Sequence, residues 1–378
     1  MQVTYTRGKP GELCEIRDFI NMVFSMHTRP HDFARMLPKL YADDAATEGE
    51  HYLVREDGRL VAAVCAHPFT LACGTRTLRC AAIGSVSVHP YVRGKGYMRK
   101  LMNTAVTDMA QSGITLSVLD GRRHRYAYFG YEPAGLRAEY TITPDNLRHM
   151  TAAHKLALTA APADPTDTAE TAALLAIQNS RTVNGAYTAQ DFHTVAVSWD
   201  GRLLVLRGGG EVVGFCITSD TGRIGELALR DESLLYDALC AVQQYLGCDV
   251  LTLPCAGWDT ARMQEVGPLY DRFALFADDK YQVFDYPAVA AFFLQAKAAQ
   301  RPLPGGRLTL SVDGGQPFAL TLQDGRADAA PCDTADYNLT HAEAMALLFS
   351  PEGLIRPQVA APAGWLPLPL YVDSPDKC

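Results

Sequence analysis

The sequence lacks an apolar run long enough to cross a membrane. A spanning helix needs about twenty consecutive, predominantly apolar residues, and no such stretch occurs in the 378 residues of the chain. The first residues also lack the basic-then-apolar pattern of a secretory signal. We therefore expect a cytoplasmic protein with no membrane partner.

The sequence also lacks closely spaced cysteine pairs. Its ten cysteines are dispersed, and none forms a CxxC pair. Zinc sites usually take their ligands from such pairs, so we expect no metal site. Most of the cysteines lie in apolar stretches, such as Cys65 and Cys240, which predicts reduced, buried thiols.

An excess of positive charge is missing as well. The formal net charge is −8, whereas binding to nucleic acid requires a basic face. We therefore expect no nucleic-acid partner. An acidic chain is compatible with a small cationic partner, such as a polyamine or an aminoglycoside.

What is present is enough apolar sequence, 48% of the chain, for several cores. Residues 1–150 read as a first α/β unit. A helix is expected at 11–25 and a tight turn at Glu56-Asp57-Gly58. We expect strands at 3–7, 51–56, 59–72, 77–88, 114–120 and 136–143, the last of which closes the unit.

Two further units follow. Residues 143–170 are rich in Ala, Pro, Thr and Asp and predict a linker. The second unit, 151–285, contains an expected helix at 233–246 and strands at 202–208, 211–218, 224–229, 250–255 and 280–286. The third, 286–378, contains helices at 288–299 and 340–350, strands at 307–313 and 317–325, and an extended tail. The spacing of Thr340 and Glu343 predicts a capping box.

The segment Val86–Arg99 carries the clearest chemical signal. A strand ends at Val88, a turn contains Gly94 and Gly96, and an apolar stripe from Met98 onward predicts a helix. Free backbone N–H groups and the helix dipole at such a turn attract anions. Arg93, Lys95 and Arg99 add positive charge. The glycines alone fit a plain strand-to-helix turn equally well.

The spacing V-x-V-x-P-x-x-R-G-x-G in this segment resembles the coenzyme A loop of the GNAT N-acetyltransferases. It differs from both the P-loop and the Rossmann pattern. Gly96-Tyr97-Met98-Arg99 and the aromatic segment Tyr126–Tyr131 are similar to the Eis (enhanced intracellular survival) branch. That resemblance implies mixed α/β sheets in two tandem GNAT-like domains, the second degenerate, followed by a sterol-carrier-like α+β domain. It also implies a homohexamer.

The resemblance implies acetyl-CoA as cosubstrate and one site per chain, because the glycine turn has no counterpart after the strand at 224–229. The residues that would bind acetyl-CoA are Val86, Ser87, Val88, Arg93, Gly94, Lys95, Gly96, Tyr97, Met98, Arg99 and Arg122.

The same resemblance assigns two catalytic positions. Tyr126 would be the general acid, because a phenol stays protonated at neutral pH and can protonate a thiolate. The α-carboxylate of Cys378 would be the general base, although its thiolate or another carboxylate remains an alternative. Tyr128, Phe129 and Tyr131 are interpreted as core aromatics, and His89 as a turn-capping residue rather than a catalytic one.

The leading hypothesis is thus an acetyl-CoA-dependent N-acetyltransferase that acts on amines of small cationic molecules by direct transfer. The alternative is a non-catalytic CoA-, lipid- or partner-binding protein built on the same folds.

Overall fold

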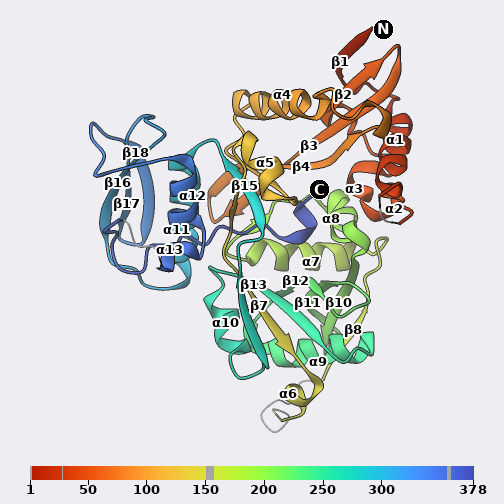
Figure 1. Cartoon of the computed structure of the whole chain (residues 1–378). Helices are drawn as coiled ribbons and strands as arrows, with labels where there is room; N and C mark the ends of the chain where they lie inside the picture. The colour runs from red at the N-terminus through yellow and green to blue at the C-terminus, as the bar shows by residue number, and fades with distance from the viewer. Residues whose placement is uncertain (1, 28, 150–156, 356–358) are drawn as a thin grey trace.

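The computed structural model describes residues 2–27, 29–149, 157–355 and 359–378. Figure 1 shows the N-terminal elements at the upper right, a second group of elements below them, and a third group at the left. The chain ends near the centre, between the first two groups. The expected mixed α/β class is confirmed.

The first unit is built around a large, mostly antiparallel sheet. Its strand order is β1-β2-β3-β4-β5-β15-β6, with the short β9 paired to β3. The bounds are β1 Val3–Arg7, β2 His51–Glu56, β3 Arg59–Cys73, β4 Arg76–Val88, β5 Leu116–Leu119, β6 Glu132–Ala134, β9 Asn184–Gly185 and β15 Asp279–Val283.

Helices cover both faces of this sheet because its strands alternate. Leu53 and Cys65 face α1 (Leu13–Ser25), α2 (Phe33–Met36) and α3 (Pro38–Tyr41). Val54 and Val64 face the opposite side, where α4 (Tyr97–Gln111) packs. A period of two along each strand sends neighbouring residues to opposite faces. The expected helix at 11–25 is thus confirmed with a slightly later start.

The two central strands of the sheet separate after a short pairing. Strands β4 and β5 are parallel, and among the described residues they pair only over Cys80–Ala82 of β4. The segment from Ile83 to Val88 therefore continues without a partner on that side, although β3 pairs it on the other. This separation opens a cleft beside the end of β4.

The second unit contains a four-stranded sheet of order β12-β11-β10-β8 and a three-stranded sheet of order β13-β7-β14. Its strands are β7 Arg137–Ile142, β8 Leu158–Pro162, β10 Arg202–Gly208, β11 Glu211–Thr218, β12 Ile224–Leu229, β13 Leu251–Ala256 and β14 Arg272–Phe276. Its helices are α6 Pro144–His149, α7 Thr168–Ser180, α8 Ala189–Ala196, α9 Leu235–Leu246 and α10 Thr260–Val266.

The first two units exchange a strand in each direction. We expected β7 to close the first unit, but it lies between β13 and β14 of the second. In return β15, expected in the second unit, pairs with β5 and β6 of the first. Both strands have two partners, so each buries its backbone groups better than it would as an edge strand. Strand pairing therefore crosses the predicted boundary near residue 150.

The predicted linker at 143–170 is wrong over much of its length. Residues 158–162 form β8, which pairs with β10, and Asp167 caps the start of α7 through the backbone N–H groups of Ala169 and Glu170. Small residues such as Ala160 and Ala161 have weak strand preference, so tertiary pairing decided this strand. The remainder of the predicted linker includes residues 150–156, which lie outside the described residues.

The third unit packs α11 (Tyr286–Gln300) against a sheet of order β18-β17-β16-β19. Its other elements are β16 Gly306–Val312, β17 Phe318–Gln323, β18 Arg326–Pro331, β19 Tyr337–Leu339, α12 His341–Phe349 and α13 Glu352–Ile355. The capping box of Thr340 and Glu343 is confirmed. One core joins α11 to the back of the first sheet, including Leu78 and Leu116.

The C-terminal tail runs from this unit back to the middle of the molecule. Trp365, Leu368, Leu370 and Val372 are buried in the shared core, and the backbone N–H of Leu136 donates to Leu370. The last turn, Ser374–Asp376, lies beside the second unit, and the chain then ends against β4 of the first. The tail thus contacts all three units.

Candidate active site

The cleft beside the end of β4 holds a cavity of about 720 Å³. Ile83 to Val86 of β4 form one wall, and Asp120 to Arg122, which follow β5, form the facing wall. The second unit contributes Trp199 and Gly225, and the tail contributes Lys377 and Cys378. The separation of β4 from β5 therefore creates the site, and segments far apart in sequence enclose it.

The glycine turn lies at the start of α4. Gly94 and Gly96 have φ angles of +85° and +81°, a region that glycine adopts readily and other residues do not. At both positions a Cβ would meet no described protein atom within 4 Å. The turn therefore faces open space, as a phosphate-binding turn requires, and the first N–H groups of α4 point outward there.

The side chains of this turn differ in their roles. Arg93 and Arg99 are exposed. The ammonium group of Lys95 instead pairs with Glu56 at 2.6 Å, and the hydroxyl of the buried Tyr97 donates to the same carboxylate. Glu56 therefore partly offsets the positive charge that Lys95 was expected to add. The backbone N–H groups of Lys95 and Tyr97 lie in the turn itself, where they can also donate to a phosphate.

The end of β4 presents its backbone to the cleft. Val86 lines the cavity, and Val86 and Val88 also pack against the core under α4. Ser87 points to the other face, where its hydroxyl is buried without a hydrogen-bond partner among the described residues. Of the three predicted residues, Val86 thus lines the cavity, and Ser87 and Val88 follow it along β4.

Tyr126 lies on the facing wall of the same cavity. It ends the short helix α5 (Arg123–Tyr126) and is 7% exposed. Its ring packs on Gly121, where a Cβ would lie 2.3 Å from the ring. Burial raises the pKa of the Tyr126 phenol, while the nearby Arg125 opposes this rise. The phenol is therefore protonated at neutral pH and able to donate a proton. Arg122, also predicted, is exposed beside it.

The end of the chain lies at the same cavity as Tyr126. Cys378 packs on Gly84 so closely that a Cβ at position 84 would lie 2.4 Å from the Cβ of Cys378. Burial raises the pKa of the Cys378 thiol to about 12, which disfavours the thiolate at neutral pH. The Cys378 thiol is therefore protonated at neutral pH, which argues against its thiolate as a base.

Comparison with known proteins identifies the first unit. Residues 4–134 match the family model of the acetyltransferase (GNAT) domain. Residues 4–134 form a GNAT domain. The chain therefore carries the fold and the function class of an acyltransferase. No curated protein sequence matches the chain significantly.

Solved structures extend the similarity beyond the GNAT domain. A GCN5-related N-acetyltransferase from Anabaena variabilis has a TM-score of 0.67 at 15% identity, with 97% of this chain and 96% of that chain covered. A probable N-acyltransferase from Enterococcus faecalis has a TM-score of 0.63 at 17% identity, covering 90% and 88%. Eis1 from Mycobacterium abscessus has a TM-score of 0.57 at 15% identity, also covering 90% and 88%. The resemblance to Eis-type proteins is confirmed at the level of the fold.

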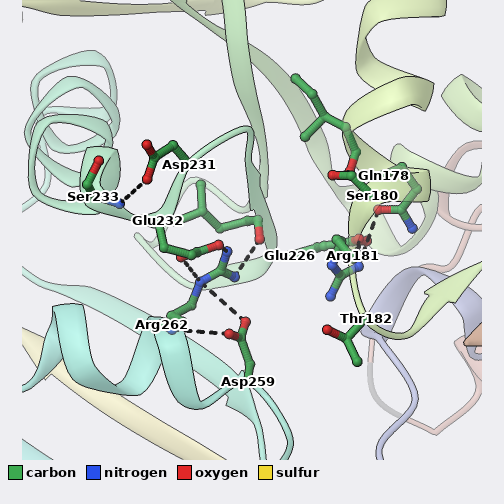
Figure 2. A network of polar contacts seen from close by, with 12 residues as sticks. Gln178, Ser180, Arg181, Thr182, Glu226, Asp231, Glu232, Ser233, Asp259 and Arg262 are labelled. Carbon is green, nitrogen blue, oxygen red and sulfur yellow. Dashed lines mark hydrogen bonds and ion pairs between the residues drawn. The ribbon is translucent and has the colours of Figure 1, made fainter. Parts of the chain in front are cut away.

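In the second unit, the connection from β12 to α9 is the counterpart of the glycine turn between β4 and α4, and it carries acidic side chains. Figure 2 shows Asp231 and Glu232 at the connection from β12 to α9. Asp231 accepts a hydrogen bond from the backbone N–H of Ser233 at 2.9 Å, and Glu232 pairs with Arg262. Carboxylates at this position repel a phosphate, and Arg262 is occupied. This connection is therefore unsuited to binding a phosphate.

Sequence reasoning missed a buried hydrogen-bond network behind the cavity of the GNAT domain. Ser85, at the cavity wall, has a φ of +53° in β4. The Tyr41 hydroxyl donates to the Ser85 hydroxyl at 2.6 Å and lies 2.9 Å from Nε2 of His51. Nδ1 of His51 contacts the carbonyl of Thr47. Burial lowers the pKa of His51, which favours the neutral ring, and its Nδ1–H can donate to the Thr47 carbonyl.

An aromatic cluster forms another wall of the cavity. Phe24, His31, Phe33 and Trp199 all line it, and Phe33 contacts each of the other rings. Three of these residues, Phe24, His31 and Phe33, come from the first unit. Trp199 was missed, because nothing in its local sequence connects the second unit to the first unit's cleft.

Two residues near the predicted motifs have structural roles. His89 caps the Pro90–Val92 turn by accepting the backbone N–H of Tyr91, which confirms its predicted role. Tyr131 is buried and hydrogen-bonded to Ser117 at 2.7 Å. By contrast Tyr128, expected in the core, is 82% exposed, so that expectation is wrong.

In the described ranges, no group of three or more His, Cys, Asp or Glu side chains is arranged to hold a metal ion. None of the helices among the described residues is long and apolar enough to cross a membrane.

Proposed function

We propose that the chain transfers the acetyl group of acetyl-CoA directly to an amine of a small cationic molecule. One observation carries this proposal: the cleft between β4 and β5 brings Tyr126 and the C-terminal residue to one cavity, and the open glycine turn follows the same strand β4. A GNAT domain supplies the function class. The amine acceptor is the part that this proposal adds.

The backbone would hold acetyl-CoA. In this proposal the N–H groups of Gly94 to Arg99 bind the pyrophosphate, with Arg93 and Arg99 adding exposed positive charge. The free side of β4 from Val86 to Val88 binds the pantetheine through backbone hydrogen bonds. Open space at both glycines fits a ligand that approaches the main chain closely.

The chemistry is one direct transfer. The Cys378 carboxylate accepts a proton from the acceptor ammonium, and the resulting amine attacks the thioester carbonyl. When the tetrahedral intermediate collapses, the carbon–sulfur bond breaks and Tyr126 donates its proton to the departing thiolate. The amine nitrogen loses its remaining extra proton on forming the amide, and Tyr126 recovers one. The net products are amide, free CoA thiol and one released proton, so no nucleophilic cysteine is required.

The aromatic wall supports a cationic acceptor. Aromatic faces attract ammonium groups, and Trp199 is 38% exposed at this wall. Several basic residues of the cavity are already paired with acids: Arg137 with Glu139 and Asp278, and Lys377 with Asp279. These pairs limit repulsion of a positive acceptor.

The test measures thiol release from acetyl-CoA with a panel of aminoglycosides, polyamines, uncharged amines and alcohols. We expect turnover with cationic amines and none with alcohols. Turnover limited to uncharged amines would contradict the cationic acceptor. Binding of acetyl-CoA without turnover on any amine would favour the non-catalytic alternative, a CoA-, lipid- or partner-binding protein.

Three further features belong to this proposal: a cytoplasmic address, a sterol-carrier-like third unit and a homohexamer. Phe273 and Leu275, on one face of the edge strand β14, are 45% and 43% exposed, and Tyr140 and Tyr270 pack beside Phe273. An exposed apolar patch of this kind supports self-association. Light scattering of the full chain would test the hexamer.

A further inference from the structure

Lys39 makes an unusual contact with the end of the chain. It lies on α3, and its ammonium group donates to the backbone carbonyl of Pro375 at 2.6 Å and to that of Lys377 at 2.7 Å. The second carbonyl belongs to the residue immediately before Cys378. A lysine in the first unit therefore holds the last peptide groups of the chain.

The two carbonyl groups accept hydrogen bonds from two of the three N–H groups of the Lys39 ammonium and do not neutralise its charge. Burial lowers the pKa of Lys39, and the largest opposing influences are the Cys378 thiol and the Asp376 carboxylate. A partly buried cation is stabilised by a nearby anion. The α-carboxylate of Cys378 belongs to the residue that follows the bonded carbonyl of Lys377, and it adds a negative charge to this end of the chain.

The α-carboxylate of Cys378 in turn needs a nearby positive charge in order to stay ionised. A base must be ionised in the free enzyme, yet burial favours the neutral acid. Nearby acids favour the neutral form further: Asp376, whose own pKa burial raises to about 6, and Glu50, whose charge acts on the thiol of Cys378. A positive charge beside the carboxylate opposes both effects.

We propose that Lys39 is a positioning residue for the C-terminal carboxylate of Cys378, which it both seats at the cleft and keeps ionised. This inference rests on the proposed role of that carboxylate as the base. Lys39 touches neither acetyl-CoA nor the acceptor in this proposal; it acts through the tail.

Other titratable groups also surround the end of the tail. The ammonium group of Lys39 donates to the carbonyls of Pro375 and Lys377, which lie on either side of Asp376 in the tail. Arg122 and Arg125 are exposed across the cavity, and Lys377 pairs with Asp279. The remaining groups that influence Cys378 or Lys39 are Tyr41 on α3, Glu50 before β2, Cys65 on β3 and Asp376 in the tail.

The experiment compares three substitutions in the full chain. Lys39→Met removes the charge and the donors, Lys39→Gln retains a donor without charge, and Lys39→Arg retains both. The pH dependence of kcat/KM is measured with one fixed amine, so that the ionisation of the acceptor is the same for all variants. We expect Lys39→Met and Lys39→Gln to move the acid limb up by about one pH unit, and Lys39→Arg to leave it near that of the unaltered chain.

Lys297 provides a matched control. Like Lys39, it donates to two tail carbonyls, those of Trp365 at 2.9 Å and Pro367 at 2.8 Å, but it is more deeply buried and lies in the third unit. Lys297→Met should lower thermal stability without moving the acid limb. If Lys39→Met and Lys39→Gln also lowered thermal stability and left the acid limb unmoved, Lys39 would be a structural clamp and the proposal would be overturned.

A C-terminal extension separates this proposal from the one on which it rests. If the extended chain keeps full turnover, the carboxylate is not the base and both proposals fail. If the extension abolishes turnover while Lys39→Gln leaves the acid limb in place, only the role of Lys39 fails. Should Lys39→Met not fold, Lys39→Gln and Lys39→Arg still decide the outcome.

Discussion

Single residues set how closely the tail and the proposed general acid approach the cleft. Gly84 leaves room for Cys378, and Gly121 leaves room for the Tyr126 ring, since a Cβ at either position would collide with its neighbour. Neither glycine stands out in the sequence, because what each accommodates comes from elsewhere in the chain. Tyr126 itself was identified from a short local motif, and the structure places it at the cavity.

Tyr126→Phe should lower turnover about 100-fold or more, because the departing thiolate loses its proton donor. Affinity for acetyl-CoA should change little, since the ring and its packing remain. Steady-state rates and calorimetric binding measure the two effects. Tyr128→Phe is the matched control: Tyr128 is 82% exposed and should tolerate the change. An unchanged rate in Tyr126→Phe would remove this residue from the mechanism.

The buried carboxyl group of Asp376 should make the stability of the folded chain depend on pH. Its side chain is 2% exposed; one oxygen accepts the Tyr187 hydroxyl at 2.8 Å, and the other has no partner in the described ranges. Burial raises the pKa of Asp376 from 3.8 to about 6. Between these values the native state binds more protons than the unfolded state, so stability falls as pH rises.

Asp376→Asn should remove this dependence. The melting temperature of the variant relative to the unaltered chain should increase as pH rises from about 4 to about 7, by an amount equivalent to roughly 2 kcal/mol. Thermal unfolding at several pH values measures it. A constant difference across this range would show that Asp376 does not titrate as proposed.

At the scale of elements, the turn between β4 and α4 requires a positive φ angle at its glycines and leaves the space beside them open. Gly96 precedes the helix with positive φ, and the N–H groups of the next residues face outward. The position of this turn and the helix after it were predictable, because the residues that form them are close together in the sequence. The orientation of Lys95 and Tyr97 toward Glu56 was not, because Glu56 lies on another strand of the sheet.

Gly96→Ala should weaken acetyl-CoA binding about tenfold, because the new Cβ projects into the space proposed for the pyrophosphate and strains the turn by about 1 kcal/mol. Titration calorimetry with CoA measures this affinity. Gly74→Ala is the control, since Gly74 also has positive φ and open surroundings but lies in the β3–β4 hairpin. Equal weakening in both variants would attribute the effect to general strain.

At the scale of the whole molecule, the site is assembled from distant segments. Arg181 pairs with both Glu226 and Asp373, which ties the tail to the second unit. Trp199 donates to the carbonyl of Lys377 at 3.1 Å, and Lys39 holds the same carbonyl from the first unit. The end of the chain is thus held from two units at the cleft.

Adding residues beyond Cys378 should abolish turnover, because it replaces the α-carboxylate by a neutral peptide bond and the seat on Gly84 leaves little space. The same addition at the N-terminus is the control, since β1 lies at the far edge of the first sheet. Turnover and acetyl-CoA affinity are measured for both chains. Full activity with the C-terminal addition would exclude the carboxylate as the base.

Local sequence determined the features that depend on neighbouring residues. The alternating strands at 51–56 and 59–72, the glycine turn before α4 and the capping box at Thr340 need only nearby chemistry. The resemblance at Val86–Arg99 and Tyr126 likewise depends on short motifs. These features were therefore predicted close to their observed bounds.

Tertiary structure decided what depends on long-range pairing. The exchange of β7 and β15 between units, the strand at 158–162 and the aromatic wall completed by Trp199 have no local signal. The contact of Lys39 with the tail joins residues more than three hundred positions apart. Such contacts form because burial and hydrogen bonds between distant segments lower the free energy of the folded state. A pattern in a short stretch of sequence carries no information about those distant partners.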